Sequence, residues 1–96
     1  MDKKEEIIFW KPELNDTLKG VLIEKLENVG RYNSNLYKIQ SGLNVVCVWG
    51  RFHLDSIMEA ASVGDMILLR YVGLTKTKNH QMKKYELEIL NNNYDQ

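Results

Sequence analysis

The residues of this sequence that could do chemistry are basic and aromatic side chains. The segment from Lys76 to Lys84 holds four lysines and one histidine and contains no acidic residue. Arg31 and Tyr32 are adjacent in a second polar segment. Binding of single-stranded nucleic acid requires cations that follow the phosphates and flat side chains on which bases stack. Both segments therefore suit a nucleic-acid surface. The alternative is a solvated hairpin loop for the lysine segment, and ordinary loop chemistry with Tyr32 capping the core for the other.

A predicted hairpin adds further candidates. Tyr37 and Lys38 alternate on its first strand, so only one of them can face outward, and the pattern leaves open which one. Trp49 and Arg51 lie at the end of its second strand, although tryptophan is often buried because of its large area. Phe52 is expected to be a core residue. The candidate nucleic-acid-binding residues are Arg31, Tyr32, Tyr37, Lys38, Trp49, Arg51, Lys76, Lys78, His80 and Lys83.

Motifs for catalysis or metal binding are missing from the sequence. It contains no phosphate-binding glycine loop, no Gly-x-Ser-x-Gly, no His-Glu-x-x-His and no Cys-x-x-Cys. His53 and His80 each lack a second ligand at metal spacing. Asp55 and Glu59 place two carboxylates on one predicted helix face, where a solvated surface is the simpler explanation. We therefore expect no enzymatic activity, no metal and no cofactor.

Length and composition indicate one small domain. The chain has 96 residues, which suits a single core. Its 13 basic and 13 acidic residues balance, which counts mildly against strong sequence-independent DNA binding. The single cysteine, Cys47, cannot form an internal disulfide, which favours a reducing compartment. We see no signal peptide and no apolar run long enough to span a membrane, and we expect a cytoplasmic protein.

Hydrophobic periodicity predicts an all-β domain with a small helical content. A short edge strand or plug over 7–10 is ended by Pro12, and Gly20 lets a long strand curl. Charged and polar tails are expected over 1–6 and 91–96. The main predicted elements are strands over 17–29, 36–40, 45–49, 66–73 and 84–90 and a helix over 52–61. One helix between the third and fourth of five strands predicts the OB-fold, a Greek-key barrel. An SH3-like barrel is the alternative, but it normally lacks that helix.

Two sequence stretches resemble a known family. Val45 to Gly50, which reads VVCVWG, is followed by the helix and then by Val63-Gly64-Asp65. This order resembles the OB domains of replication protein A, and still more their small phage and prokaryotic relatives. Trp10-Lys11-Pro12 and the segment from Asp16 to Val21 are similar to the first-strand entry of such phage proteins. The resemblance covers about residues 10–90 and implies single-stranded DNA binding along the second and third strands, between two flanking loops.

The sequence also departs from this family, and alternatives stay open. The loop after the first strand is short, and the tail lacks the acidic and aromatic ending with which bacterial single-strand binders recruit partners. We expect non-sequence-specific binding of single-stranded DNA in replication or recombination, in a phage or mobile element, with homo-oligomers or replication proteins as possible partners. A protein-interaction module is the alternative that the neutral charge favours. RNA binding by a cold-shock-like barrel is a third, but the strands lack the dense aromatic pattern of such proteins.

Overall fold

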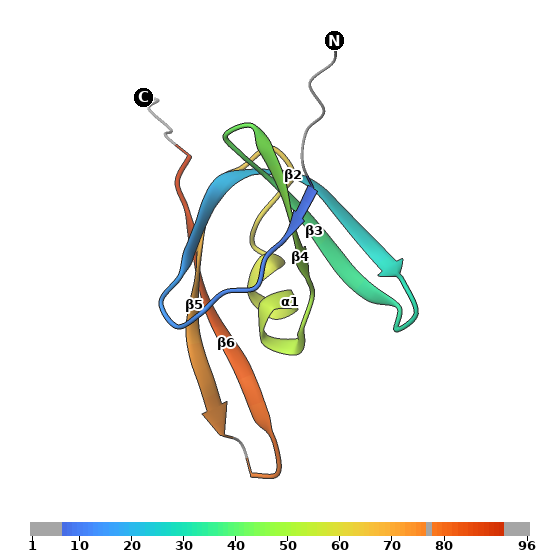
Figure 1. Cartoon of the computed structure of the whole chain (residues 1–96), viewed down its shortest axis with the longest axis vertical. Coiled ribbons are helices and arrows are strands. Elements are labelled where there is room, and N and C mark those ends of the chain that lie inside the picture. The colour runs from blue at the N-terminus through green and yellow to red at the C-terminus, as the bar shows by residue number, and fades with distance from the viewer. Residues whose placement is uncertain (1–6, 77, 92–96) are drawn as a thin grey trace.

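The computed structural model describes residues 7–76 and 78–91, and these form strands and one helix (Figure 1). The expected mostly-β fold is confirmed. The elements are β1 (Ile7–Phe9), β2 (Thr17–Val29), β3 (Ser34–Ser41), β4 (Asn44–Trp49), α1 (Phe52–Met58), β5 (Met66–Lys76) and β6 (Gln81–Ile89). The expected tails lie outside the described residues, except for Asn91. Its side chain accepts a hydrogen bond from the backbone N–H of Met66 at 2.8 Å and donates one to Asp65 at 2.7 Å.

The strands form one six-stranded sheet in the order β1-β4-β3-β2-β5-β6. The expected closed barrel of five strands is therefore wrong in strand number and in closure. The physical reason is β1, which pairs in parallel with β4, with Phe9 opposite Cys47, and so takes the edge of β4 that a closing strand would need. The short apolar segment is thus an edge strand, and α1 lies between the fourth and fifth strands of the observed order.

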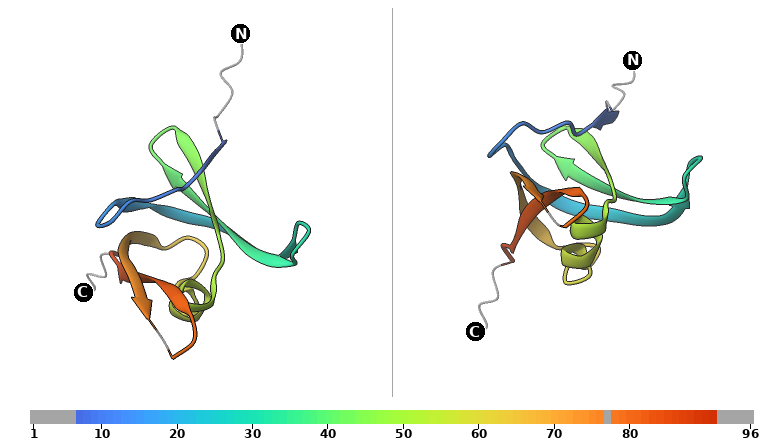
Figure 2. Two further views of the ribbon diagram at one scale, coloured as in Figure 1. Left: turned by 60° about the horizontal axis from the view of Figure 1, so that its bottom comes forward. Right: turned by 90° about the horizontal axis from the view of Figure 1, so that it is seen from below.

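The long strand β2 connects the two halves of the sheet, which agrees with the curvature predicted from Gly20. Its first residues pair with β5 and its later residues with β3, while Val21 has a partner on both sides. Gly20 lies where β2 crosses β3, and a Cβ atom there would collide with the backbone oxygen of Gln40. The β2–β3 and β5–β6 hairpins consequently diverge from a common centre, on either side of α1 (Figures 1 and 2).

The main core lies where the curved sheet wraps around α1. Leu54 and Met58 of the helix are almost fully buried, and the helix ends three residues before the predicted boundary at Ala61, which is buried beyond it. The sheet contributes Leu18, Leu22, Tyr37, Ile39, Val46, Val48, Ile67, Leu69 and Tyr85. A smaller apolar cluster of Leu36, Val45 and Cys47 covers the opposite face of β3 and β4.

Candidate nucleic-acid interface

Two hollows share Trp49 and Arg51 at the end of β4, and the surface that they make up together is here called the aromatic groove. The first is lined by Val29, Gly30, Arg31, Tyr32, Ser34, Trp49, Gly50 and Arg51. The second is lined by Phe9, Trp10, Lys11, Pro12, Val48, Trp49, Arg51, Lys83 and Tyr85. Trp49 and Arg51 belong to both, so the groove runs from the β2–β3 loop, past the end of β4, to β1 and β6.

The described lining of the aromatic groove carries positive charge. Among residues 7–76 and 78–91 it includes four cations, Lys11, Arg31, Arg51 and Lys83, and no aspartate or glutamate. In a chain with zero net charge, this is a local separation of charge. A surface lined by several cations attracts phosphates, because their positive potentials add.

Trp49 is the central ring of the groove. It is 39% exposed, so burial in the core is not its role. Strand alternation explains this, since Val46 and Val48 point into the main core and Trp49 points to the opposite face. The ring of Phe9 lies parallel to it, with centroids 5.9 Å apart and an angle of 7° between the planes. The sequence therefore places two partly exposed rings next to each other.

The chain turns sharply after Trp49, and this turn puts Arg51 into the groove. The backbone N–H of Gly50 donates to the backbone oxygen of Asn35 at 2.7 Å. A Cβ atom at Gly50 would collide with the carboxylate of Asp55 and crowd Asn35, so a side chain at this position would force its neighbours to shift. Arg51 and Phe52 then follow as exposed residues, and Phe52 is 81% exposed. The expectation that Phe52 belongs to the core is wrong, because the helix presents its opposite side to the sheet.

Arg31 and Tyr32 lie at the other end of the groove. Tyr32 is 80% exposed, and the Arg31 guanidinium lies 5.9 Å from the centre of its ring. The backbone of this loop is left-handed at Gly30 and Asn33, two residue types that tolerate that conformation. The tight turn holds both side chains at the tip of the hairpin, beside Trp49.

The β6 side of the groove is anchored by Tyr85. Its ring contacts Trp10 with centroids 6.2 Å apart, and its backbone N–H donates to Nδ1 of His53 at 3.1 Å, which ties β6 to α1. Burial raises the pKa of the Tyr85 hydroxyl, while the nearby positive charge of Arg51 opposes the rise. Tyr85 therefore stays neutral, and Lys83, two residues away on the same strand, is exposed in the groove.

Tyr37 and Lys38 do not join the groove. Tyr37 is 5% exposed, and its hydroxyl donates to Oδ1 of Asp55 at 2.5 Å. Burial, together with this hydrogen bond, raises the pKa of that hydroxyl. Tyr37 is thus a core residue and offers no ring face to a base. Lys38 is the outward-facing member of the pair, and its Nζ lies 3.4 Å from Glu24, which neutralises its charge locally.

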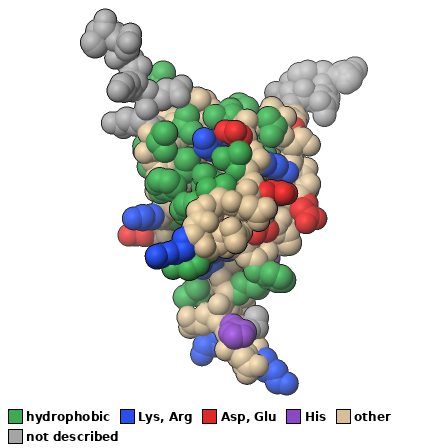
Figure 3. All heavy atoms as spheres, turned by 90° about the vertical axis from the view of Figure 1, so that its right-hand side faces the viewer, with side chains coloured by type: hydrophobic (Ala, Val, Ile, Leu, Met, Phe, Trp, Pro, Cys, Tyr) green, Lys and Arg blue, Asp and Glu red, His purple; other side chains and the backbone are tan. Residues whose placement is uncertain are grey.

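The remaining predicted residues lie at the end of the β5–β6 hairpin. Lys76, Lys78 and His80 are exposed there, beyond the groove. Figure 3 shows this projecting end with basic and histidine side chains and without acidic ones on the face in view. The structure therefore brings Arg31, Tyr32, Trp49, Arg51 and Lys83 into the lining of the groove, and it places Lys76, Lys78 and His80 outside that lining.

The N-terminal contribution to the groove was missed by sequence reasoning. Phe9, Trp10 and Lys11 line it. The signal in the sequence is the run of two aromatic residues and a lysine before Pro12. The position of this segment beside β4 becomes apparent only from the pairing of the strands in the sheet.

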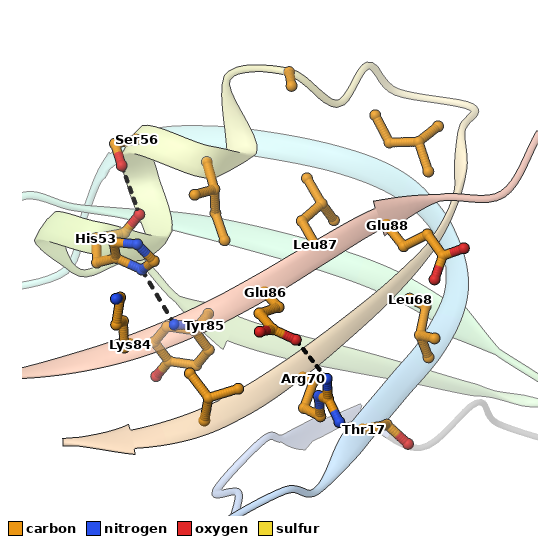
Figure 4. Close-up of a pocket in the computed structure, with 14 residues that line it drawn as sticks. Thr17, His53, Ser56, Leu68, Arg70, Lys84, Tyr85, Glu86, Leu87 and Glu88 are labelled. Carbon is orange, nitrogen blue, oxygen red and sulfur yellow. Dashed lines mark hydrogen bonds and ion pairs between the residues drawn. The ribbon is translucent and has the colours of Figure 1, made fainter. Parts of the chain in front are cut away.

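A third hollow, between α1 and the β5–β6 hairpin, has a different character. Its lining includes Glu88 and the ion pair of Arg70 with Glu86, in which Nη2 of Arg70 lies 2.5 Å from Oε1 of Glu86 (Figure 4). Its two acidic side chains, Glu86 and Glu88, are balanced by Arg70 and Lys84, so this hollow lacks the excess of positive charge found in the groove.

Comparison with known proteins found no match: no family model fits the chain, and no curated protein or solved structure is significantly similar to it. Within residues 7–76 and 78–91, no group of histidine, cysteine or acidic side chains could hold a metal ion. No helix in this part of the chain is long and apolar enough to cross a membrane.

Proposed function

We propose that this protein binds single-stranded DNA without sequence specificity and without catalysing a reaction. The observation that carries the proposal is the aromatic groove, whose described lining combines exposed rings with four cations and contains no acidic residue. Rings provide stacking surfaces for bases of any sequence, and cations contact the phosphates. Neither contact reads base edges, so no strong sequence preference is expected.

The exposure of the side chains indicates which of them could stack with bases and which could contact phosphates. Tyr32 and Trp49 offer ring faces, while Arg31, Arg51 and Lys83 lie beside them for phosphate contacts. A base in a duplex is already stacked and paired, so only an unpaired strand can use these rings fully. The groove therefore favours single strands over duplexes.

The order of the elements supports the same proposal. Leaving β1 aside, the strands run β4-β3-β2-β5-β6, with α1 directly after β4. This is the order expected for an OB-fold that has not closed, and OB-folds bind oligonucleotides on their second and third strands and flanking loops. Those positions correspond here to β3, β4 and the ends of the two hairpins. A role in replication or recombination agrees with the sequence resemblance.

The test is a titration of fluorescent oligo-dT at low and moderate salt, with duplex DNA and oligo-U as competitors. We expect the binding of oligo-dT to weaken steeply with salt. We also expect duplex DNA to compete less well than oligo-dT itself. Stronger competition by oligo-U would reassign the ligand to RNA. No binding even at low salt would refute the proposal.

A protein-interaction module is the second candidate, because β1 exposes apolar surface. Ile7 is 65% exposed and Ile8 40%, and both lie on an edge strand. Exposed apolar edge strands commonly pair with other chains. A sedimentation experiment that shows concentration-dependent self-association, together with absent DNA binding, would favour this candidate.

A further inference from the structure

The N-terminal strand β1 lies across part of the proposed binding groove. It consists of three residues, Ile7–Phe9, and all three are exposed. Its hydrogen-bonded partner in the sheet is β4 alone, in parallel register. Short segments with few buried contacts and one pairing edge are the first parts of a fold to open. β1 is therefore held less firmly than the strands that carry the core.

Phe9 occupies the ring surface that a base would use. Its ring is parallel to that of Trp49, 5.9 Å away between centroids. This offset stack is the kind of arrangement that aromatic side chains favour with each other. A base stacked on an aromatic ring gains at least as much as a second side chain does. Phe9 and an incoming base thus compete for one side of Trp49.

The attachment of β1 next to the groove strengthens the competition. The backbone N–H of Trp10 donates to the backbone oxygen of Cys47 at 2.9 Å, and Lys11 and Pro12 continue along the groove wall. A strand of DNA that follows the cations from Arg31 past Arg51 to Lys83 meets this segment directly.

We infer that β1 is a displaceable strap, which covers one side of Trp49 in the free protein and leaves β4 when single-stranded DNA binds. The inference rests on the proposed function, since it concerns regulation of the same groove. Release of β1 costs free energy, so the strap lowers the affinity of the protein for single-stranded DNA. This affinity then depends on how firmly β1 is attached to β4.

The first test is the affinity of Phe9→Ala for oligo-dT. Removing the competing ring should tighten binding roughly 2- to 10-fold, the range of one aromatic pair. Leu43→Ala is the matched control, because Leu43 is 82% exposed in the β3–β4 turn and does not line the groove. It should leave affinity unchanged. Weaker binding by Phe9→Ala would overturn the inference, because Phe9 would then be a stacking surface itself.

The second test needs no variant and uses hydrogen exchange of the wild-type protein with and without saturating oligo-dT. Amides of residues 7–10 should exchange faster when the oligonucleotide is bound, while those of β4 near Trp49 are protected. Slower or unchanged exchange over 7–10 would show that β1 stays in place and would overturn the strap, leaving DNA binding intact. If neither the wild type nor Phe9→Ala binds oligo-dT, both the strap and the proposed function are refuted.

Discussion

Arg51→Ala is the most direct perturbation of the aromatic groove, because Arg51 lines both of its halves. Each phosphate neutralised on a single strand contributes about −0.7 to the slope of log affinity against log salt. If the four lining cations each contact one phosphate, the slope should be about −2.8, a loss of roughly 50-fold between 50 and 200 mM salt. Without Arg51 the slope should be about −2.1, and the loss roughly 20-fold.

Fluorescence anisotropy of labelled oligo-dT over a series of NaCl concentrations measures both slopes. Lys19→Ala is the control, because Lys19 is exposed on β2 and does not line the groove. We expect it to keep the wild-type slope. The reasoning is refuted if Arg51→Ala leaves the slope unchanged, or if Lys19→Ala reduces it equally. In either case binding would depend on overall charge and not on the groove.

Three further predictions test separate parts of the structure. Tyr32→Ala should weaken oligo-dT binding by about 1–3 kcal/mol, the value of one stacked base, in the same titration; an unchanged affinity would assign Tyr32 to a bystander loop. Lys76→Glu combined with Lys78→Glu should weaken binding to all sequences alike, and more for long than for short oligonucleotides, since these residues lie at the hairpin end. A changed base preference with full affinity would contradict that role. Hydrogen bonds from the Ser62 backbone and the Asn91 side chain hold the pKa of Asp65 below its ordinary value of 3.8. The stabilisation that this carboxylate provides should therefore be complete above that pH and be lost as the pH falls through the lowered pKa. Urea unfolding at neutral and acidic pH should show the difference in free energy between wild type and Asp65→Asn narrowing on acidification, and a constant difference would argue against the lowered pKa.

The sequence predicted the strands well because their signals are local. The long strand was correct in both bounds, Thr17–Val29, and its curvature was expected from Gly20. The two final strands were predicted too short, because the Lys-rich segment contains residues that continue the ladder of β5 and β6 as exposed positions. A polar composition on a solvent-facing hairpin is compatible with a strand as well as with a loop.

The parts of the site that could not be predicted depend on tertiary structure. Alternation showed that Tyr37 and Lys38 face opposite ways, but which of them is buried depends on the face that α1 covers. Phe52 begins the helix, and its exposure is set by the angle at which the chain turns at Gly50. β1 has only three residues, too few for a periodic signal, and its partner β4 is more than thirty residues away in sequence. Closure of the sheet was predicted wrongly for the same reason.

Zero net charge seemed an argument against DNA binding, yet it changes what kind of binding is expected. Some acidic side chains are paired away from the groove, for example Glu24 with Lys38 and Glu86 with Arg70, and the described lining of the groove holds four cations. With only a few phosphate contacts, electrostatic attraction is limited, and stacking must supply a larger share of the affinity. Electrostatic attraction acts on single strands and duplexes alike, whereas stacking on Trp49 and Tyr32 needs an unpaired base. A weakly charged groove with exposed rings should therefore discriminate against duplex DNA more sharply than a strongly basic surface would.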